Sequence, residues 1–98
     1  MRESPHVGEV GRCIDVACRG DMSGATAPYL LVQKPSGNIA NWTAEMLQDE
    51  AGFILRYTTK LGDLNEAGQY KIHPYVTTGS WTGPAGNLLL LRVKALFS

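Results

Sequence analysis

The sequence has few charged residues, no excess of either sign and no long apolar run. Only 18% of its 98 residues are Asp, Glu, Lys or Arg, and nine basic residues cancel nine acidic ones. This balance removes the main driving force for binding nucleic acid or an anionic lipid surface. No apolar run approaches the roughly 20 residues that span a bilayer, and the first residues lack a secretory apolar core. We therefore expect a soluble protein that starts at its own initiator, with no nucleic-acid and no membrane partner.

Cysteine and histidine are also scarce, with two residues of each. In an extended strand Cys13 and Cys18 lie roughly 16 Å apart, whereas a disulfide needs Cα atoms closer than about 7 Å. Their odd spacing places them on opposite faces of a strand, which argues against a shared metal ion. We predict two free, inert thiols that are buried or semi-buried, as suits a reducing compartment. His6 and His73 have no partner at the spacing of metal ligands, so no metal site is expected.

The length favours one globular domain over residues 1–98, with residues 1–10 as an N-terminal arm. Eleven glycines and five prolines separate short β-rich runs. This spacing is typical of an all-β sandwich or barrel. Apolar residues alternate with other residues in six runs, which predicts strands over 12–18, 29–34, 41–46, 53–58, 69–78 and 89–95.

Two segments also fit helical structure. Ala44, Leu47 and Ala51 have helical spacing, so a helix over 44–51 is an alternative to the third strand. The segment 61–67 is poor in β-branched residues and carries Asp63 as a capping residue. It predicts a single helical turn between two strands.

The most specific pattern surrounds Tyr70. Leu64, Gly68 and Tyr70, followed by the apolar Ile72, match a tyrosine corner. In such a corner the ring fills the core, and the hydroxyl bonds to backbone a few residues upstream. Gly68 allows a backbone geometry that a side chain would obstruct. Because Ile72 stands where antibody domains place a cysteine, packing alone would close the sandwich, with Trp42 as its core tryptophan.

A succession of short motifs adds a family resemblance. They are Val7-Gly8-Glu9-Val10-Gly11, Asp21-Met22-Ser23-Gly24-Ala25-Thr26, Lys34-Pro35-Ser36-Gly37, Trp42-Thr43-Ala44, Arg56-Tyr57-Thr58-Thr59, Gly62-Asp63-Leu64 and Gly68-Gln69-Tyr70. Over roughly residues 7 to 95 the chain resembles the small immunoglobulin-like domains of tailed bacteriophages, such as the N-terminal domains of baseplate upper proteins. Pro74 departs from this pattern, because such domains more often carry a hydrogen-bond donor there, and it suggests a bulge or an edge strand.

The resemblance implies an immunoglobulin-like antiparallel sandwich of six to seven strands. It also implies a non-enzymatic structural protein of the virion, made in the host cytoplasm and placed at the tail, baseplate or capsid surface. Its partners would be other virion proteins, with self-association into a homo-oligomer as an option.

The residues offer little for catalysis. Asp49 and Glu50 are neighbours before Gly52, which is typical of a solvated turn, whereas an acid and base pair must converge across a cleft. A serine nucleophile elbow and a phosphate-binding loop are both absent from the sequence. We expect no catalytic residue and no cofactor.

Two features predict a contact surface. Leu88 to Leu91 are apolar on both faces of the last strand, so if Leu89 and Leu91 face inward, Leu88 and Leu90 face outward. Tyr75 could extend that patch, which marks an interface unless a loop or the N-terminal arm covers it. Glycines flank Trp81, predicting a flexible loop that either binds a partner or caps the core. An alternative function is therefore a module that binds host-surface carbohydrate through the Trp81 loop.

Overall fold

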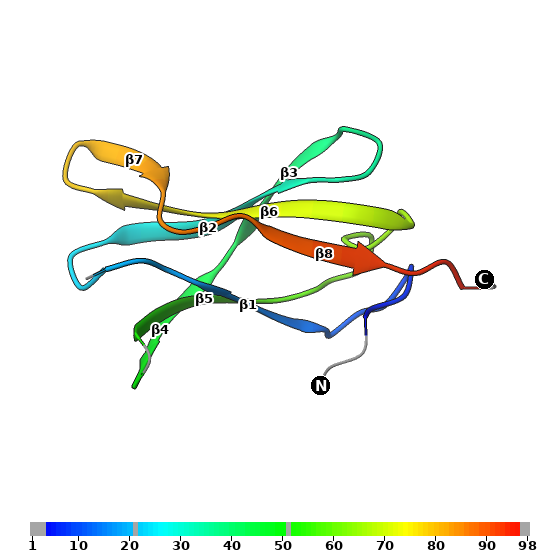
Figure 1. Ribbon diagram of the computed structural model, residues 1–98, viewed down its shortest axis with the longest axis horizontal. Coiled ribbons are helices and arrows are strands. Elements are labelled where there is room, and N and C mark those ends of the chain that lie inside the picture. Colours follow the sequence, from blue (N-terminus) through cyan, green and yellow to red (C-terminus); the bar gives the residue numbers. More distant parts are fainter. Residues whose placement is uncertain (1–3, 21, 51, 97–98) are drawn as a thin grey trace.

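The computed structural model describes residues 4–20, 22–50 and 52–96 and folds them into eight β-strands (Figure 1). The strands are β1 (Cys13–Ala17), β2 (Thr26–Gln33), β3 (Ile39–Thr43), β4 (Glu45–Asp49), β5 (Gly52–Thr58), β6 (Gly68–Thr78), β7 (Trp81–Pro84) and β8 (Leu89–Val93). The smaller antiparallel sheet has the order β1-β5-β4. The larger has the order β3-β2-β6, with β7 and β8 both paired to the remaining side of β6. Their packing confirms the predicted all-β sandwich.

The predicted count of six to seven strands is wrong, because the described residues form eight. The run 41–46 is divided between β3 and β4, and the residues around Trp81 form β7 instead of a loop. The alternative helix over 44–51 is also excluded, because Glu45–Asp49 pairs with β5 as a strand. Asp21, Ala51 and the first three residues of the predicted arm lie outside the described residues.

The chain changes sheets at Ala44. The Ala44 N–H donates to the Pro28 carbonyl oxygen at 3.1 Å, the last bond of this segment to β2. The next residue, Glu45, already pairs with Arg56 of the smaller sheet. The alternation of apolar residues runs through this transfer without a break, because Trp42, Ala44 and Met46 all pack on the same core. The sequence pattern therefore predicts the buried residues but not the change of sheet.

The core lies between the two sheets. Its buried residues are Ile14, Val16, Leu30, Val32, Trp42, Leu55, Tyr57, Leu64, Tyr70, Ile72, Val76, Ala85 and Val93. The Trp42 ring of β3 stacks on the Tyr57 ring of β5, with centroids 4.8 Å apart and planes 15° apart. Since the two rings belong to different sheets, their stacking joins the sheets directly, as expected of a core tryptophan.

Pro74 lies neither on an edge strand nor in a bulge, contrary to the sequence expectation. It is in the middle of β6, paired with Leu30 of β2. Its carbonyl oxygen accepts a hydrogen bond from Ala85, in the interval between β7 and β8. In an antiparallel strand the nitrogen of a residue faces the same side as its carbonyl oxygen. The proline nitrogen therefore faces a break in the ladder, where no backbone donor is required.

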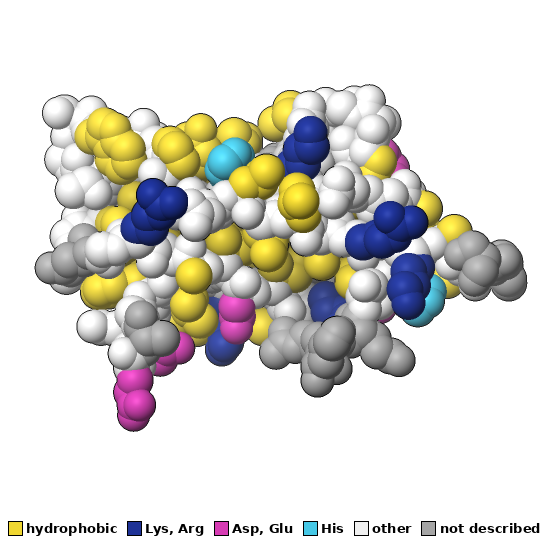
Figure 2. Space-filling model, viewed as in Figure 1, with side chains coloured by type: hydrophobic (Ala, Val, Ile, Leu, Met, Phe, Trp, Pro, Cys, Tyr) yellow, Lys and Arg dark blue, Asp and Glu magenta, His cyan; other side chains and the backbone are white. Residues whose placement is uncertain are grey.

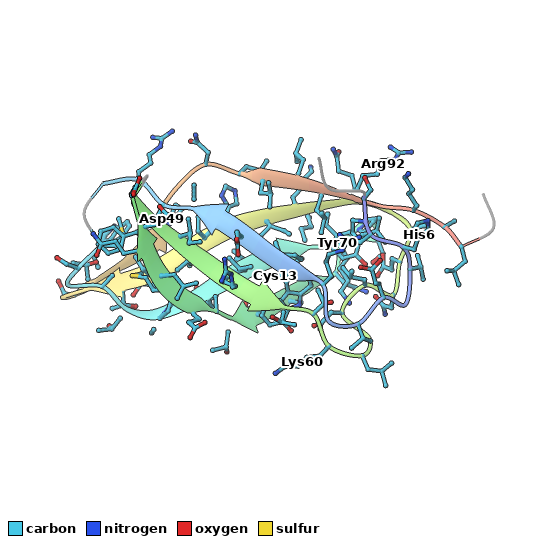
Figure 3. The ribbon with its side chains drawn as sticks, turned by 90° about the horizontal axis from the view of Figure 1, so that it is seen from below. His6, Cys13, Asp49, Lys60, Tyr70 and Arg92 are labelled. Carbon is cyan, nitrogen blue, oxygen red and sulfur yellow. The ribbon has the colours of Figure 1, made fainter. Side chains whose placement is uncertain are left out.

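The tyrosine corner is confirmed. Tyr70 is fully buried, and its hydroxyl donates to the Glu66 carbonyl oxygen at 3.2 Å and accepts from the Glu66 N–H at 3.1 Å. Figure 3 shows Tyr70 at the end of the sandwich that also carries His6. Leu64 is buried beside it in the core cluster. The segment before β6 is a turn closed by the Asp63 N–H on the Lys60 carbonyl oxygen, and not the predicted helical turn.

Replacing Tyr70 by phenylalanine should lower the free energy of unfolding by about 1 to 3 kcal/mol, because it leaves two part-buried backbone groups of Glu66 without their partner. Urea unfolding followed by fluorescence measures this change. Tyr29→Phe is the matched control, since Tyr29 is only half-buried on the outside of the larger sheet. A Tyr70→Phe midpoint equal to that of the control would remove the corner from the account.

Candidate functional site

The outward surface of the larger sheet, which we call the outer face, carries two of the four predicted interface residues. Leu90 of β8 is 52% exposed and lies opposite Lys71 of β6. Tyr75 lies on the same face of β6 as Lys71, because the two residues are four positions apart in one strand. Its side chain is half-buried. Leu88 precedes β8 and is 42% exposed. The described residues therefore cover neither leucine, whereas Leu89 and Leu91 pack against the core as predicted.

The outer face also holds apolar residues that sequence reasoning did not assign to it. The Tyr29 ring of β2 stacks on the Tyr75 ring with centroids 5.3 Å apart. Leu31 lies two residues along the same face, opposite His73, and Ile39 of β3 is 60% exposed. The signal was present, because residues 29–32 are apolar at every position, as are residues 88–91. Such runs indicate a strand with no fully solvated face.

Trp81 lies elsewhere, in strand β7 and not in the flexible loop that was expected. Trp81 pairs with Thr78, which lies two residues after the buried Val76 and so on the same face of β6. Because paired residues share a face, the Trp81 side chain projects toward the core side of the sheet. Its ring lies over Gly83, where an added Cβ would come within 2.5 Å of Trp81 Cζ2. The ring is 51% exposed and is not part of the buried core. Trp81 and Tyr75 thus point to opposite faces.

A groove runs along the side of the sandwich where β1 and β8, the edge strands of the two sheets, lie next to each other (Figure 1). One part has a volume of about 330 Å³ and is lined by Ser4, Pro5, residues 12–15 and residues 89–92. A second part of about 350 Å³ is lined by residues 15–19 and 87–89. Both parts are lined by Asp15 and Leu89, so they adjoin each other, and we refer to them together as the groove. Figure 2 shows hydrophobic side chains along the middle of this side.

The groove is lined by more arginine than acidic side chains. Asp15 forms an ion pair with Arg56 at 2.8 Å, and this hydrogen bond and charge raise the pKa of the guanidinium. Arg12 forms an ion pair with Glu9 at 2.6 Å. Arg92 and Arg19 line opposite ends of the groove, and neither forms an ion pair within residues 4–20, 22–50 and 52–96. The rim of the groove therefore has a surplus of positive charge.

The candidates for chemistry occupy structural positions. Asp49 Oδ1 accepts the Gly52 N–H at 3.2 Å, which is the turn predicted for this acidic pair. Tyr57 donates to Asp63, and burial together with this bond raises the pKa of the phenol. His73 Nδ1 is buried without a hydrogen-bond partner in the described part of the chain. No group of three or more metal-ligating side chains occurs among those residues.

Both cysteines are free thiols, as predicted. Cys18 packs against the core, and burial raises the pKa of its thiol. Cys13 lies on β1, where its parity places it on the outward side of the smaller sheet, and its Sγ lies 3.7 Å from Asp15 Oδ1.

The chain matches no protein-family model, no curated protein and no solved structure with which it was compared. Among the described residues, no helix is long and apolar enough to cross a membrane.

Proposed function

We propose that this protein is a non-enzymatic structural component of a bacteriophage virion, which binds other virion proteins through the β8 side of its larger sheet. The observation that carries the proposal is the exposed apolar surface around Leu90, continued across the outer face by the stacked pair Tyr29 and Tyr75. Exposed apolar surface of this kind usually marks a protein contact. The virion as the location rests on the resemblance of the turn motifs to phage domains, and it makes tail, baseplate and capsid proteins the expected partners.

The proposal includes an immunoglobulin-like arrangement of the sandwich. Its support is the strand order: a three-stranded sheet β1-β5-β4 faces a sheet in which β3, β2 and β6 are neighbours and the last strands flank β6. Immunoglobulin domains divide their strands between two sheets in a comparable way, and their tyrosine corner also opens a late strand. The Tyr70 hydroxyl on the Glu66 backbone adds a second point of agreement.

The alternative function, carbohydrate binding through Trp81, is supported less well. Stacking on a sugar favours aromatic rings that share one surface, whereas Trp81 and the Tyr29–Tyr75 pair project to opposite faces of the larger sheet. Gly79 and Ser80 form the turn of a tight hairpin, so Trp81 also lacks the flexible loop that the alternative assumed.

The proposal predicts that Leu88→Lys combined with Leu90→Lys leaves the domain folded and abolishes its incorporation into virions. The core residues Leu89, Leu91 and Val93 remain, whereas two desolvated ammonium groups would oppose the contact. Circular dichroism checks the fold, and co-sedimentation with virions or purified tail and capsid proteins checks assembly. Leu61→Lys is the matched control, because Leu61 is 88% exposed in the turn before β6.

Two results would contradict the proposal. Absence of wild-type protein from purified virions would overturn the virion location. Normal incorporation of the folded double variant would place the contact away from β8.

A further inference from the structure

The groove between β1 and β8 is bounded by a backbone edge that continues an existing ladder. Lys94, just after β8, donates its N–H to the Pro5 carbonyl oxygen at 2.8 Å and accepts the Val7 N–H at 2.9 Å. These bonds form a parallel bridge between His6 and Lys94. Because backbone groups of a strand alternate between its two sides, the N–H and C=O groups of Arg92 and Leu90 face the same edge as those of Lys94. Leu89, Leu91 and Val93 face β6 instead.

Among the described residues, the backbone bonds on this edge are those of Lys94. They do not continue back along β8, which begins at Leu89. A strand edge with exposed N–H and C=O groups is a template for pairing with another chain. Here it adjoins the groove of about 330 Å³, whose mixed lining includes the apolar side chains of Ile14, Leu89 and Leu91. Leu89 and Leu91 face the core but remain partly exposed, so the sandwich is not closed along this side. An added strand would pair with β8 and cover these side chains at the same time.

The charges at the two ends of the groove specify the added strand further. Arg92 lies at one end and Arg19 at the other, where Arg19 donates to the Asn87 side-chain oxygen instead of a carboxylate. The nearest carboxylate in the lining, Asp15, is engaged by Arg56. A strand with acidic residues at both ends would therefore find complementary charge. A second copy of β8 fits less well, because its own Arg92 would meet like charge.

We propose that the edge of β8 binds an extended segment of another protein by strand addition, with apolar side chains at alternate positions inserted into the β1–β8 groove and acidic residues at both ends. This is the strand-addition mode of peptide recognition, in which main-chain bonds supply affinity and pockets for alternate side chains supply specificity. It rests on the proposed function, because it specifies how a virion partner would engage the β8 side.

The test uses the full chain and the capped peptide EVTVTVTVE, with EVVTTTVVE as a control of the same composition. We expect the first peptide to bind and the control to bind at least tenfold more weakly, because strict alternation presents all four valines to the groove whereas the control presents only two. Amide hydrogen exchange gives a readout that needs no variant. On binding, the Leu90 and Arg92 amides should gain protection, whereas the Leu89 and Leu91 amides, already bonded to β6, should not change.

Three variants separate backbone pairing from side-chain contact. Leu90→Pro removes an outward N–H and should weaken binding about tenfold, the effect of losing roughly one backbone hydrogen bond. Leu90→Ala keeps that N–H and should bind within about threefold of wild type. Asn41→Pro is the matched control, because Asn41 lies on the opposite edge strand of the same sheet, with its N–H also facing outward. It should bind like wild type.

Equal binding of the two peptides, or exchange protection away from β8, would overturn strand addition. So would a wild-type dimer that Leu90→Pro dissociates, because the occupant would then be a second copy. The proposed function fails separately: it requires wild-type protein in virions and loss of the Leu88→Lys, Leu90→Lys variant from them. It stands if those results hold while the peptide fails to bind.

Discussion

Replacing Trp42 by alanine is expected to lower the free energy of unfolding by about 3 to 5 kcal/mol, the range for truncating a buried large aromatic residue. Trp42 is 4% exposed and stacks on Tyr57 of the opposite sheet. The substitution therefore leaves a cavity between the sheets and removes a ring contact worth about 0.5 to 1.5 kcal/mol beyond its buried area. Because the total stability of such a domain is about 5 to 15 kcal/mol, the variant should be close to unfolding at 37 °C.

Urea unfolding monitored by far-ultraviolet circular dichroism measures this loss without depending on tryptophan fluorescence. Trp42→Phe is the control, since it retains an aromatic ring facing Tyr57 and should recover more than half of the stability. Trp81→Ala is a second control, because Trp81 is 51% exposed and outside the core. If Trp42→Ala and Trp81→Ala had the same midpoint, Trp42 would not join the sheets as the structure implies.

Replacing Gly68 by alanine is expected to lower the free energy of unfolding by about 2 to 6 kcal/mol, the sum of two contributions. Gly68 opens β6 with φ at +128°, a conformation that side chains rarely adopt, and such strain costs about 1 to 3 kcal/mol. An added Cβ would also lie 2.9 Å from both Cβ and Cγ of Pro35, so the turn after β2 would have to shift. Overpacking of this kind adds about 1 to 3 kcal/mol.

Two glycine variants separate these contributions in the same unfolding assay. Gly79→Ala lies in the β6–β7 turn with φ at +61° and no atom within 4 Å of an added Cβ, so it should show only the backbone strain. Gly24→Ala has neither a positive φ nor a nearby atom and should leave the midpoint unchanged. A Gly68→Ala loss no larger than that of Gly79→Ala would mean that the contact with Pro35 is unimportant.

The sequence predicts buried positions well where alternation is strict. Ile14, Val16, Leu30 and Val32 are all buried in their strands, and Tyr70 makes the predicted corner bond. These predictions succeed because both features depend on residues close together in the chain: the two-residue period of a strand, and a hydrogen bond between residues four positions apart. Long-range pairing is not encoded in this way.

The wrong predictions about Ala44 and Pro74 share that cause, whereas the missed strand β7 does not. At Ala44 the chain leaves β2, where it bonds to Pro28, and joins β5, where Glu45 pairs with Arg56. The alternation of apolar residues is the same in both sheets, so it does not show this change of partner. β7 was missed although Gly79 and Ser80 are a recognisable two-residue hairpin turn. Pro74 predicted an edge strand or a bulge, because proline cannot donate to a ladder. That prediction failed because the sequence does not show that the strand beside Pro74 is interrupted between β7 and β8.

The same limit applies to the contact surface. Leu88 and Leu90 were identified from a run that is apolar on both faces, and both are exposed. Tyr29 and Leu31 were not added to them, because their shared face with Tyr75 follows from the pairing of β2 with β6. The groove between β1 and β8 joins strands more than seventy residues apart in the chain, so only the folded structure shows it.

The most direct measurement of the central claim, that the β8 side is the contact with other virion proteins, is hydrogen exchange on the protein free in solution and within purified virions. Assembly should add protection at the Leu90 and Arg92 amides and in the residues that line the groove, while the amides of β4 on the other sheet keep their free-state exchange. Protection that appears on β4 and leaves Leu90 and Arg92 unchanged would contradict it.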